Sequence, residues 1–150
     1  MGQSLVTNYI HIVFSTKHRV PMIDSAIEEE LHSYLGGICK NLEYQPIRVG
    51  GYTNHIHILC LLSKKVALVT LMEDLKSHSS KWIKTKGGAY RNFYWQDGYG
   101  AFSVNPRDVD MIVNYIANQQ KHHGDKSYEE EYRTILSKYE VEYDERYVWD

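Results

Sequence analysis

The order in which strand-like and helix-like segments follow one another is the feature that most constrains the fold of this chain. The segment Tyr9–Phe14 is β-branched and aromatic throughout, which is typical of a strand covered on at least one face. Next, Asp24 or Ser25 can cap a helix in which apolar residues recur at helical spacing from Ile27 to about Asn41. The chain is therefore predicted to begin with a strand and a helix.

A hairpin is predicted next. Tyr44–Val49 and His55–Leu62 both have the composition of strands, and the second is strongly apolar. The Gly50-Gly51 pair between them indicates a turn. We expect the two strands to pair antiparallel across this turn.

A second helix, a strand and a further helix complete the predicted elements. Apolar residues recur at helical spacing from Leu68 to Trp82, and the Gly87-Gly88 pair ends that helix. A fourth strand is expected between residues 93 and 104. The last helix is predicted to begin at Asn105-Pro106, a good cap followed by a favoured first residue, and to end near Gly124.

The resulting order, β-α-β-β-α-β followed by a helix, indicates an α+β chain with a ferredoxin-like split β-α-β antiparallel sheet and an additional C-terminal helix. The 150 residues fit one compact domain, so we expect a single domain over residues 1–150. No apolar run is long enough to cross a bilayer, which predicts no membrane span and a cytoplasmic protein. The fold class alone decides no function, because many activities use this sheet.

Charge is distributed unevenly along the chain. The net charge is −2, but residues 1–123 hold 13 Lys and Arg against 10 Asp and Glu, whereas residues 124–150 hold 4 against 9. We therefore interpret residues 124–150 as an acidic C-terminal tail. In the rest of the chain, the stretch from Lys76 to Arg91 contains five basic residues and no acidic one, which suits either a phosphate-binding surface or a solvated helix face.

Two histidines are the first residues with a chemical signature. His55 and His57 lie two apart on a predicted strand, so both side chains leave the same face while Ile56 and Ile58 leave the other. Two imidazoles on one face can bind one metal ion, although such a pair also occurs in strands without a metal.

A second pair lies on the last predicted helix. Tyr115 and Gln119 are four residues apart, which brings them together at the edge of the apolar stripe of that helix. A packing tyrosine would occupy the same position, since the chain contains thirteen tyrosines.

Further motifs are spread over nearly the whole chain. In order they are Val13–Arg19, Asn54–Leu59, Phe93–Val104, Tyr115–Gln119, His122-His123 and Tyr143–Trp149. This set resembles the insertion-sequence tyrosine transposases of the HUH class, including the REP-associated tyrosine transposases. The HUH class is named for two histidines that flank a hydrophobic residue. The usual acidic residue before the first histidine is Asn54 here, which affects a contact that orients a metal ligand.

The resemblance implies a divalent metal site. In the family, the residues that match His55, His57 and Gln119 hold Mg²⁺ or Mn²⁺ against the scissile phosphate, where the ion polarises a non-bridging oxygen. His11 is expected beside this site because the first and third strands should be neighbours, and a packed strand histidine is the alternative interpretation. His122 is a further neighbour that could contact DNA.

The resemblance also implies a covalent mechanism. The residue that matches Tyr115 attacks phosphorus, joins the 5′ end of the DNA to the enzyme and releases a 3′ hydroxyl. The C-terminal helix that carries Tyr115 is then the catalytic helix. The phosphodiester energy is retained, so no nucleotide cofactor is needed. The implied partner is single-stranded or hairpin DNA, and the implied assembly is a homodimer in which Tyr115 can serve the partner's histidines.

Basic residues suggest where DNA binds. We predict phosphate contacts for Lys17, Arg19, Lys76, Lys81 and Lys84. The alternative function is a domesticated, non-catalytic module of the same fold that binds single-stranded nucleic acid. A metal-dependent hydrolase of small phosphates is a third interpretation, which the run of basic residues disfavours.

Overall fold

The computed structural model describes residues 2–150 and contains a four-stranded antiparallel sheet. The strands are β1 (Tyr9–Ser15), β2 (Gln45–Tyr52), β3 (His55–Leu61) and β4 (Gly100–Val104), in the order β2-β3-β1-β4. Strand β1 pairs with β3 on one side and with β4 on the other, so β1 and β3 occupy the centre. With its two helical crossovers this is the ferredoxin-like split β-α-β sheet, and the predicted fold class is confirmed.

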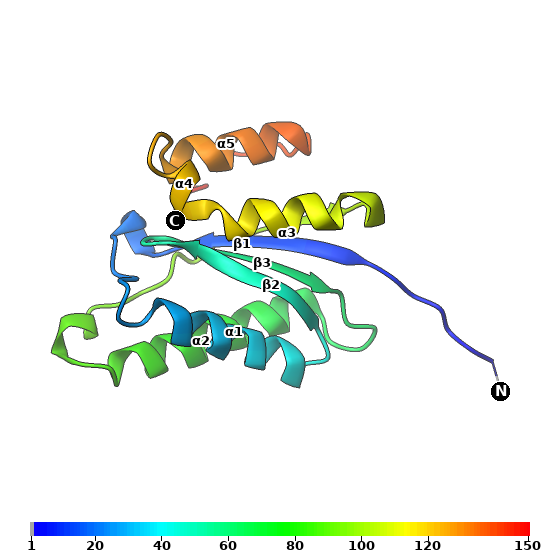
Figure 1. Cartoon of the computed structure of the whole chain (residues 1–150), viewed down its shortest axis with the longest axis horizontal. Coiled ribbons are helices and arrows are strands. Elements are labelled where there is room, and N and C mark those ends of the chain that lie inside the picture. The colour runs from blue at the N-terminus through cyan, green and yellow to red at the C-terminus, as the bar shows by residue number, and fades with distance from the viewer. Residues whose placement is uncertain (1) are drawn as a thin grey trace.

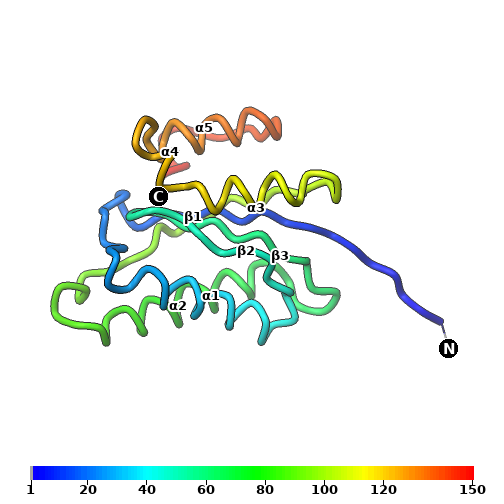
Figure 2. The backbone as a smooth tube through the Cα atoms, viewed as in Figure 1, coloured from blue at the N-terminus to red at the C-terminus, as the bar shows by residue number. Residues whose placement is uncertain are grey.

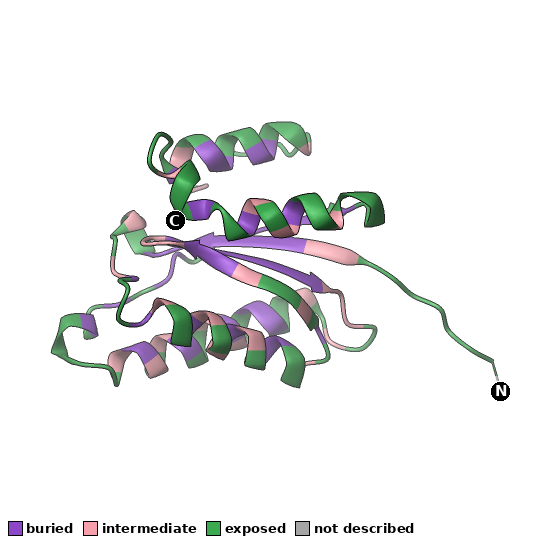
Figure 3. Cartoon of the chain, in the orientation of Figure 1, coloured by how far each residue is buried: buried purple, intermediate pink, exposed green. Residues whose placement is uncertain are grey.

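Helices α1 (Glu28–Asn41) and α2 (Leu68–Lys84) cover one face of the sheet (Figure 1 and Figure 2). Because successive side chains of a strand point to opposite faces, Ile12 of β1 and Ile56 of β3 are buried against these helices. Figure 3 shows the buried positions of the central strands and of the inner helix faces in purple. The main apolar core therefore lies between the sheet and these two helices.

The opposite face carries α3 (Val109–Ala117), α4 (Gln119–His122) and α5 (Tyr128–Lys138). Two smaller apolar clusters attach them: Leu59, Val104, Ile112 and Ile116 form one, and Val13, Phe102, Tyr128, Tyr132, Ile135 and Leu136 form the other. The sheet is thus covered on both faces. None of the helices in residues 2–150 has the length and hydropathy of a membrane span.

The helix predicted from Asn105 to near Gly124 is shorter than expected and interrupted. Its start is as predicted, since the Asn105 side chain accepts a hydrogen bond from the Arg107 N–H and Pro106 opens a short 3-10 turn. Its end differs, because Asn118 leaves helical geometry at φ −101° and ψ 19° and separates α3 from α4. Asparagine is a weak helix former, and the break places Gln119 on a separate helix from Tyr115.

Helix α5 was not predicted, because residues 124–150 were interpreted from their charge alone. The Ser127 side chain caps its first turn by accepting from the Glu130 N–H. One side of the helix is buried against the sheet through Tyr128, Tyr132, Ile135 and Leu136. The acidic residues that gave the segment its charge lie partly on the other side, so a high net charge concealed an amphipathic helix.

The prediction of a turn at Gly50-Gly51 is wrong. Both glycines belong to β2, and the hairpin turn is made by Thr53 and Asn54. A Cβ on Gly50 would lie 2.6 Å from Ile116 Cγ2, and Gly51 has φ +158° with the His55 carbonyl oxygen 2.2 Å from where its Cβ would be. These glycines mark close backbone approach rather than a turn. Gly50 lets α3 pack directly on the sheet.

We expect the substitution Gly50→Ala to lower the free energy of unfolding by about 1 to 3 kcal/mol, because the added methyl group would overlap α3. Urea denaturation followed by circular dichroism measures the change. Gly37→Ala on α1 is the matched control, since nothing lies within 4 Å of its Cβ position. Equal stability of Gly50→Ala and the unmodified protein would contradict this account of how α3 is seated.

Candidate active site

The two histidines of β3 lie on the face of the sheet that α3, α4 and α5 cover. Both side chains are fully buried, and the intervening Ile56 packs on the opposite face. This is the arrangement expected from their spacing. The rings lie edge to face with their centroids 5.1 Å apart, so their Nε2 atoms can approach one point.

Oxygen and nitrogen atoms from three elements converge on these histidines. His55 Nε2 lies 2.8 Å from Gln119 Oε1 and 3.3 Å from Glu131 Oε1, and His57 Nε2 lies 3.1 Å from the same Glu131 oxygen. His123 Nε2 is 3.1 Å from Gln119 Oε1 and 3.3 Å from Glu131 Oε1. His55, His57 and Glu131 present ligand atoms that all lie within 4.8 Å of one another, close enough to hold one metal ion.

The protonation of His55 can be derived from its neighbours. Asn54 Nδ2 donates to the Arg19 carbonyl, so Asn54 turns its Oδ1 toward His55 Nδ1, 2.8 Å away. An amide oxygen only accepts, and His55 Nδ1 must therefore carry the hydrogen. Burial lowers the pKa of His55 to about 4, which leaves Nε2 with a lone pair at neutral pH. That lone pair faces two oxygens, an arrangement that favours a bound cation.

The Asn54 amide oxygen thus fixes the orientation of the His55 ring. On the other ring, His11 Nε2 of β1 lies 2.8 Å from His57 Nδ1, and the two rings stack with centroids 5.0 Å apart. His11 is therefore beside the site, as predicted from strand order. Burial first, and then the neighbouring His57, lower the pKa of His11 to about 3. His11 is neutral and can orient its neighbour without adding charge.

Glu131 is the residue that sequence reasoning missed. It lies on α5, within the segment interpreted as an acidic tail, and its side chain is buried. Burial opposes ionisation, but hydrogen bonds from His123 and His57 hold the pKa of Glu131 well below its ordinary value. A signal was present: Glu131 shares the apolar stripe of Tyr128 and Ile135, where a carboxylate needs partners.

Tyr115 reaches the same carboxylate from α3. Its hydroxyl donates to Glu131 Oε2, and Gln119 Nε2 donates to that oxygen over 3.0 Å. The ring meets His57 edge-on at 5.6 Å between centroids and lies 4.9 Å from the His122 ring. Burial, together with the negative charge of Glu131, raises the pKa of Tyr115 well above its ordinary value. One chain thus brings Tyr115, Gln119 and both histidines together.

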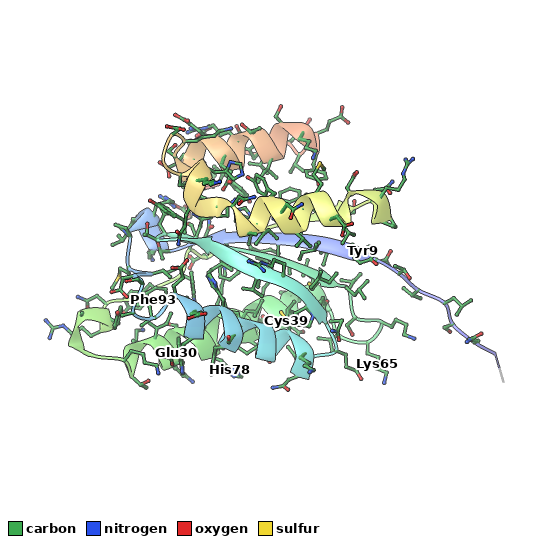
Figure 4. All side chains as sticks on the ribbon, in the orientation of Figure 1. Tyr9, Glu30, Cys39, Lys65, His78 and Phe93 are labelled. Carbon is green, nitrogen blue, oxygen red and sulfur yellow. The ribbon has the colours of Figure 1, made fainter. Side chains whose placement is uncertain are left out.

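The predicted DNA-binding lysines of α2 lie elsewhere. Helix α2 is on the opposite face of the sheet from Tyr115, as its residue His78 shows in Figure 4. Lys76 Nζ donates to the carbonyl oxygens of Gln96, Asp97 and Gly98 at 2.7 to 2.8 Å, and burial lowers its pKa to about 8. In this conformation the amine of Lys76 has a structural role, so its position does not support the predicted phosphate contact.

The remaining predicted contacts are distributed between the two sides. Lys81 and Lys84 share α2, and the Lys84 amine lies 4.3 Å from the centroid of the Tyr94 ring. Lys17 and Arg19 form a 3-10 turn that touches the site, since the Arg19 carbonyl accepts from Asn54. The Arg19 guanidinium itself donates to the Trp149 carbonyl. Of the five basic residues, Arg19 is therefore the one whose contacts lead to the histidines, through Asn54.

Comparison with known proteins agrees with the fold and indicates the family. A family model described as "Transposase IS200 like" matches residues 4–119, which includes Tyr115 and Gln119 but ends before α5. A solved structure of a protein from Deinococcus radiodurans R1, assigned as a transposase, aligns with a TM-score of 0.61 and 18% identity over 79% of this chain and 96% of the other. No curated protein sequence matches.

A second solved structure is a REP-associated tyrosine transposase bound to a REP hairpin. It aligns with a TM-score of 0.61 and 13% identity over 83% of this chain and 73% of the other. At these identities the two structures show a shared fold.

We expect the metal-free protein to lose stability as the pH falls from 7 to 5. The folded pKa of His55, about 4, lies below the ordinary value of 6.5, so the unfolded chain binds more protons between these values and stability falls with pH. His55→Gln should remove about 2 kcal/mol of this loss. Urea denaturation in EDTA at both pH values measures the loss of stability. The control is His78→Gln, because His78 is an exposed residue of α2. Identical pH dependence in His55→Gln and the unmodified protein would mean that His55 is not held neutral.

Proposed function

The chain belongs to the family of IS200-like transposases, and on this premise we propose that it cleaves and rejoins single-stranded DNA with Tyr115 as the nucleophile. The observation that carries the proposal is the position of the Tyr115 hydroxyl, which shares one carboxylate with the two histidines of β3. The Tyr115 hydroxyl and His57 Nε2 thus contact the two oxygens of the same carboxylate.

The donor set fits a divalent metal ion. His55, His57, Gln119 and Glu131 would hold it, with the lone pair of His55 already directed at the two oxygens. The contacts of 2.8 to 3.3 Å between donor atoms match the separation of about 3 Å expected for neighbouring ligands around an ion with bonds of about 2.1 Å. Mg²⁺ or Mn²⁺ bound there would polarise a non-bridging oxygen of the scissile phosphate.

Tyr115 and Glu131 supply the covalent step. The Tyr115 oxygen forms a bond to phosphorus while the bond from phosphorus to the 3′ oxygen breaks, so the DNA 5′ phosphate becomes attached to tyrosine and a 3′ hydroxyl leaves. Glu131 Oε2 accepts the phenolic hydrogen in the resting structure and would pass this proton to the leaving 3′ oxygen, because a carboxylate with a lowered pKa does not retain it. Attack by another 3′ hydroxyl reverses the step, so rejoining needs no nucleotide cofactor.

We propose single-stranded or hairpin DNA as the partner. The REP-associated neighbour was solved with a REP hairpin, which supports a hairpin substrate here. Lys17 and Arg19 lie on the 3-10 turn whose Arg19 carbonyl accepts a hydrogen bond from Asn54, and we propose that both side chains meet the DNA backbone. In this proposal, the lysines of α2 on the far face of the sheet contribute less.

We propose that the site is complete within one chain. Tyr115 of α3 contacts His57 and Glu131 of the same chain, so a homodimer, which the family resemblance implies, is not needed to supply the nucleophile. We therefore propose that Tyr115 acts on phosphate held by its own histidines. Dimer formation remains a proposal that concerns assembly rather than catalysis.

Tyr115→Phe should abolish the covalent protein–DNA adduct, because it removes only the attacking oxygen. The measurement is denaturing electrophoresis of protein incubated with labelled single-stranded DNA and Mn²⁺. DNA binding should stay within a few-fold, and Tyr147→Phe on the exposed surface is the control. An adduct in Tyr115→Phe would reject the assignment, and binding without any adduct in the unmodified protein would favour the non-catalytic module.

A mixture of Tyr115→Phe and His57→Ala proteins tests where each site is assembled. If each chain builds its own site, the mixture stays inactive after subunit exchange has been shown by tagged pull-down. Recovery of adduct formation would show that Tyr115 serves the histidines of a partner chain.

Glu131→Gln should weaken Mn²⁺ binding at least 10-fold, because a neutral amide replaces the carboxylate of the ligand set. Isothermal titration calorimetry measures the affinity, and adduct formation should slow by about 100-fold or more through loss of the proton acceptor. The matched control is Glu130→Gln, the preceding residue of α5, which is exposed. Unchanged Mn²⁺ affinity in Glu131→Gln would remove Glu131 from the metal site.

A further inference from the structure

A cavity of about 300 Å³ opens between α3 and α5 directly beside the nucleophile. Tyr115, Glu131 and His11 of β1 are among the residues that line it. The cavity is therefore continuous with the site at which phosphorus would be attacked. Apart from Tyr115 and Glu131, most residues that line the cavity have no role in the proposed mechanism.

The walls of the cavity are apolar and partly aromatic. Met111 and Ile112 line it from α3, Ile135 lines it from α5, and Tyr139 lies just beyond the end of α5. Met111 is 53% exposed although it is a large apolar side chain. Concave, mainly apolar sites with a few polar groups are typical of pockets for flat organic ligands.

Two lysines are among the polar residues of the cavity. Lys126, between α4 and α5, and Lys138 at the end of α5 both line it and are exposed. Among residues 2–150 neither ammonium group forms an ion pair with a carboxylate. The acidic C-terminal segment thus presents two available positive charges at the nucleophile, where they can contact the phosphates of a strand.

We propose that this cavity binds one unpaired nucleobase of the DNA strand, that of a nucleotide flanking the scissile phosphate. The proposal rests on the function proposed above, since it places the phosphate at Tyr115. The base of a nucleotide is attached through its sugar to the phosphate, so a phosphate at Tyr115 brings the adjacent base to the cavity. The apolar walls accept the faces of the base, and Lys126 and Lys138 meet the neighbouring phosphates.

The cavity also gives a reason for preferring single-stranded DNA. A base paired and stacked in a duplex would have to leave the helix to enter, which requires energy for unpairing and unstacking. An unpaired base can enter the cavity without this cost in free energy. The preference would therefore arise at the nucleophile itself, in addition to any contacts with the DNA backbone.

The first step of the test defines a substrate. A single-stranded oligonucleotide pool with a random central segment is incubated with the protein and Mn²⁺, and covalent adducts are recovered and sequenced. The absence of adducts from every sequence would reject the proposed function, and with it the inference. Recovered adducts identify the scissile phosphate and the nucleotide on each side of it.

The second step measures binding without cleavage, by fluorescence anisotropy with Tyr115→Phe protein. Replacing one of the two flanking nucleotides by an abasic site should weaken binding about 10-fold, because base stacking is lost. An abasic site four nucleotides away is the control and should have a smaller effect. If neither flanking abasic site weakens binding more than this control, the cavity does not bind a base, although the proposed function stands.

A truncation locates the base in the cavity. Met111→Ala, added to Tyr115→Phe, should reduce the abasic penalty at least threefold, because the side chain and the base would no longer touch. Val69→Ala on α2 is the matched control, since Val69 is similarly exposed at 54% on the far face of the sheet. An abasic penalty that is the same with Met111→Ala as without it would place the base elsewhere and overturn the inference.

Discussion

The carboxylate of Glu131 is buried among three imidazole rings, and the arrangement of the second face of the sheet depends on it. One oxygen faces His55, His57 and His123, and the other accepts hydrogen bonds from Tyr115 and Gln119. An ionised carboxylate taken out of water is strongly destabilising unless such partners surround it. The same contacts therefore connect β3, α3, α4 and α5, and the apolar contacts of Tyr128 and Ile135 hold α5 close enough to make them.

The two faces of the sheet have different tasks. Between the sheet and α1 and α2, buried side chains such as Ile12, Ile56 and Leu71 form a continuous apolar core. On the other face, the apolar contacts are divided into two smaller clusters, and the space between them holds buried polar side chains. The proposed metal site requires such buried polar side chains. The apolar core on the opposite face offsets the free-energy cost of burying them. The alternation of side chains along β3 assigns its histidines to one face and its isoleucines to the other.

Charge along the sequence is a poor guide to charge at the site. The segment after residue 123 is acidic overall, yet its buried glutamate completes the proposed metal site, and its Lys126 and Lys138 line the cavity at Tyr115. Conversely, the basic run of α2 lies across the sheet, and Lys76 binds three backbone carbonyls there. Because Coulomb interactions fall off within about 10 Å in salt solution, the local arrangement matters more than the net charge.

The sequence alone determined the order of the elements, the shared face of His55 and His57, and the closeness of Tyr115 to Gln119, because strand alternation and helical spacing are local properties. It misassigned Gly50 and Gly51, since a close approach to α3 is not visible from their neighbours in the chain. Only the tertiary structure decided that Glu131 is the central side chain and that Asn54 orients His55 through its amide oxygen. The physical reason is distance in the chain: Glu131 lies 74 residues from His57, and its place on the apolar stripe of α5 indicates burial but not which partners it meets until α5 folds onto the sheet.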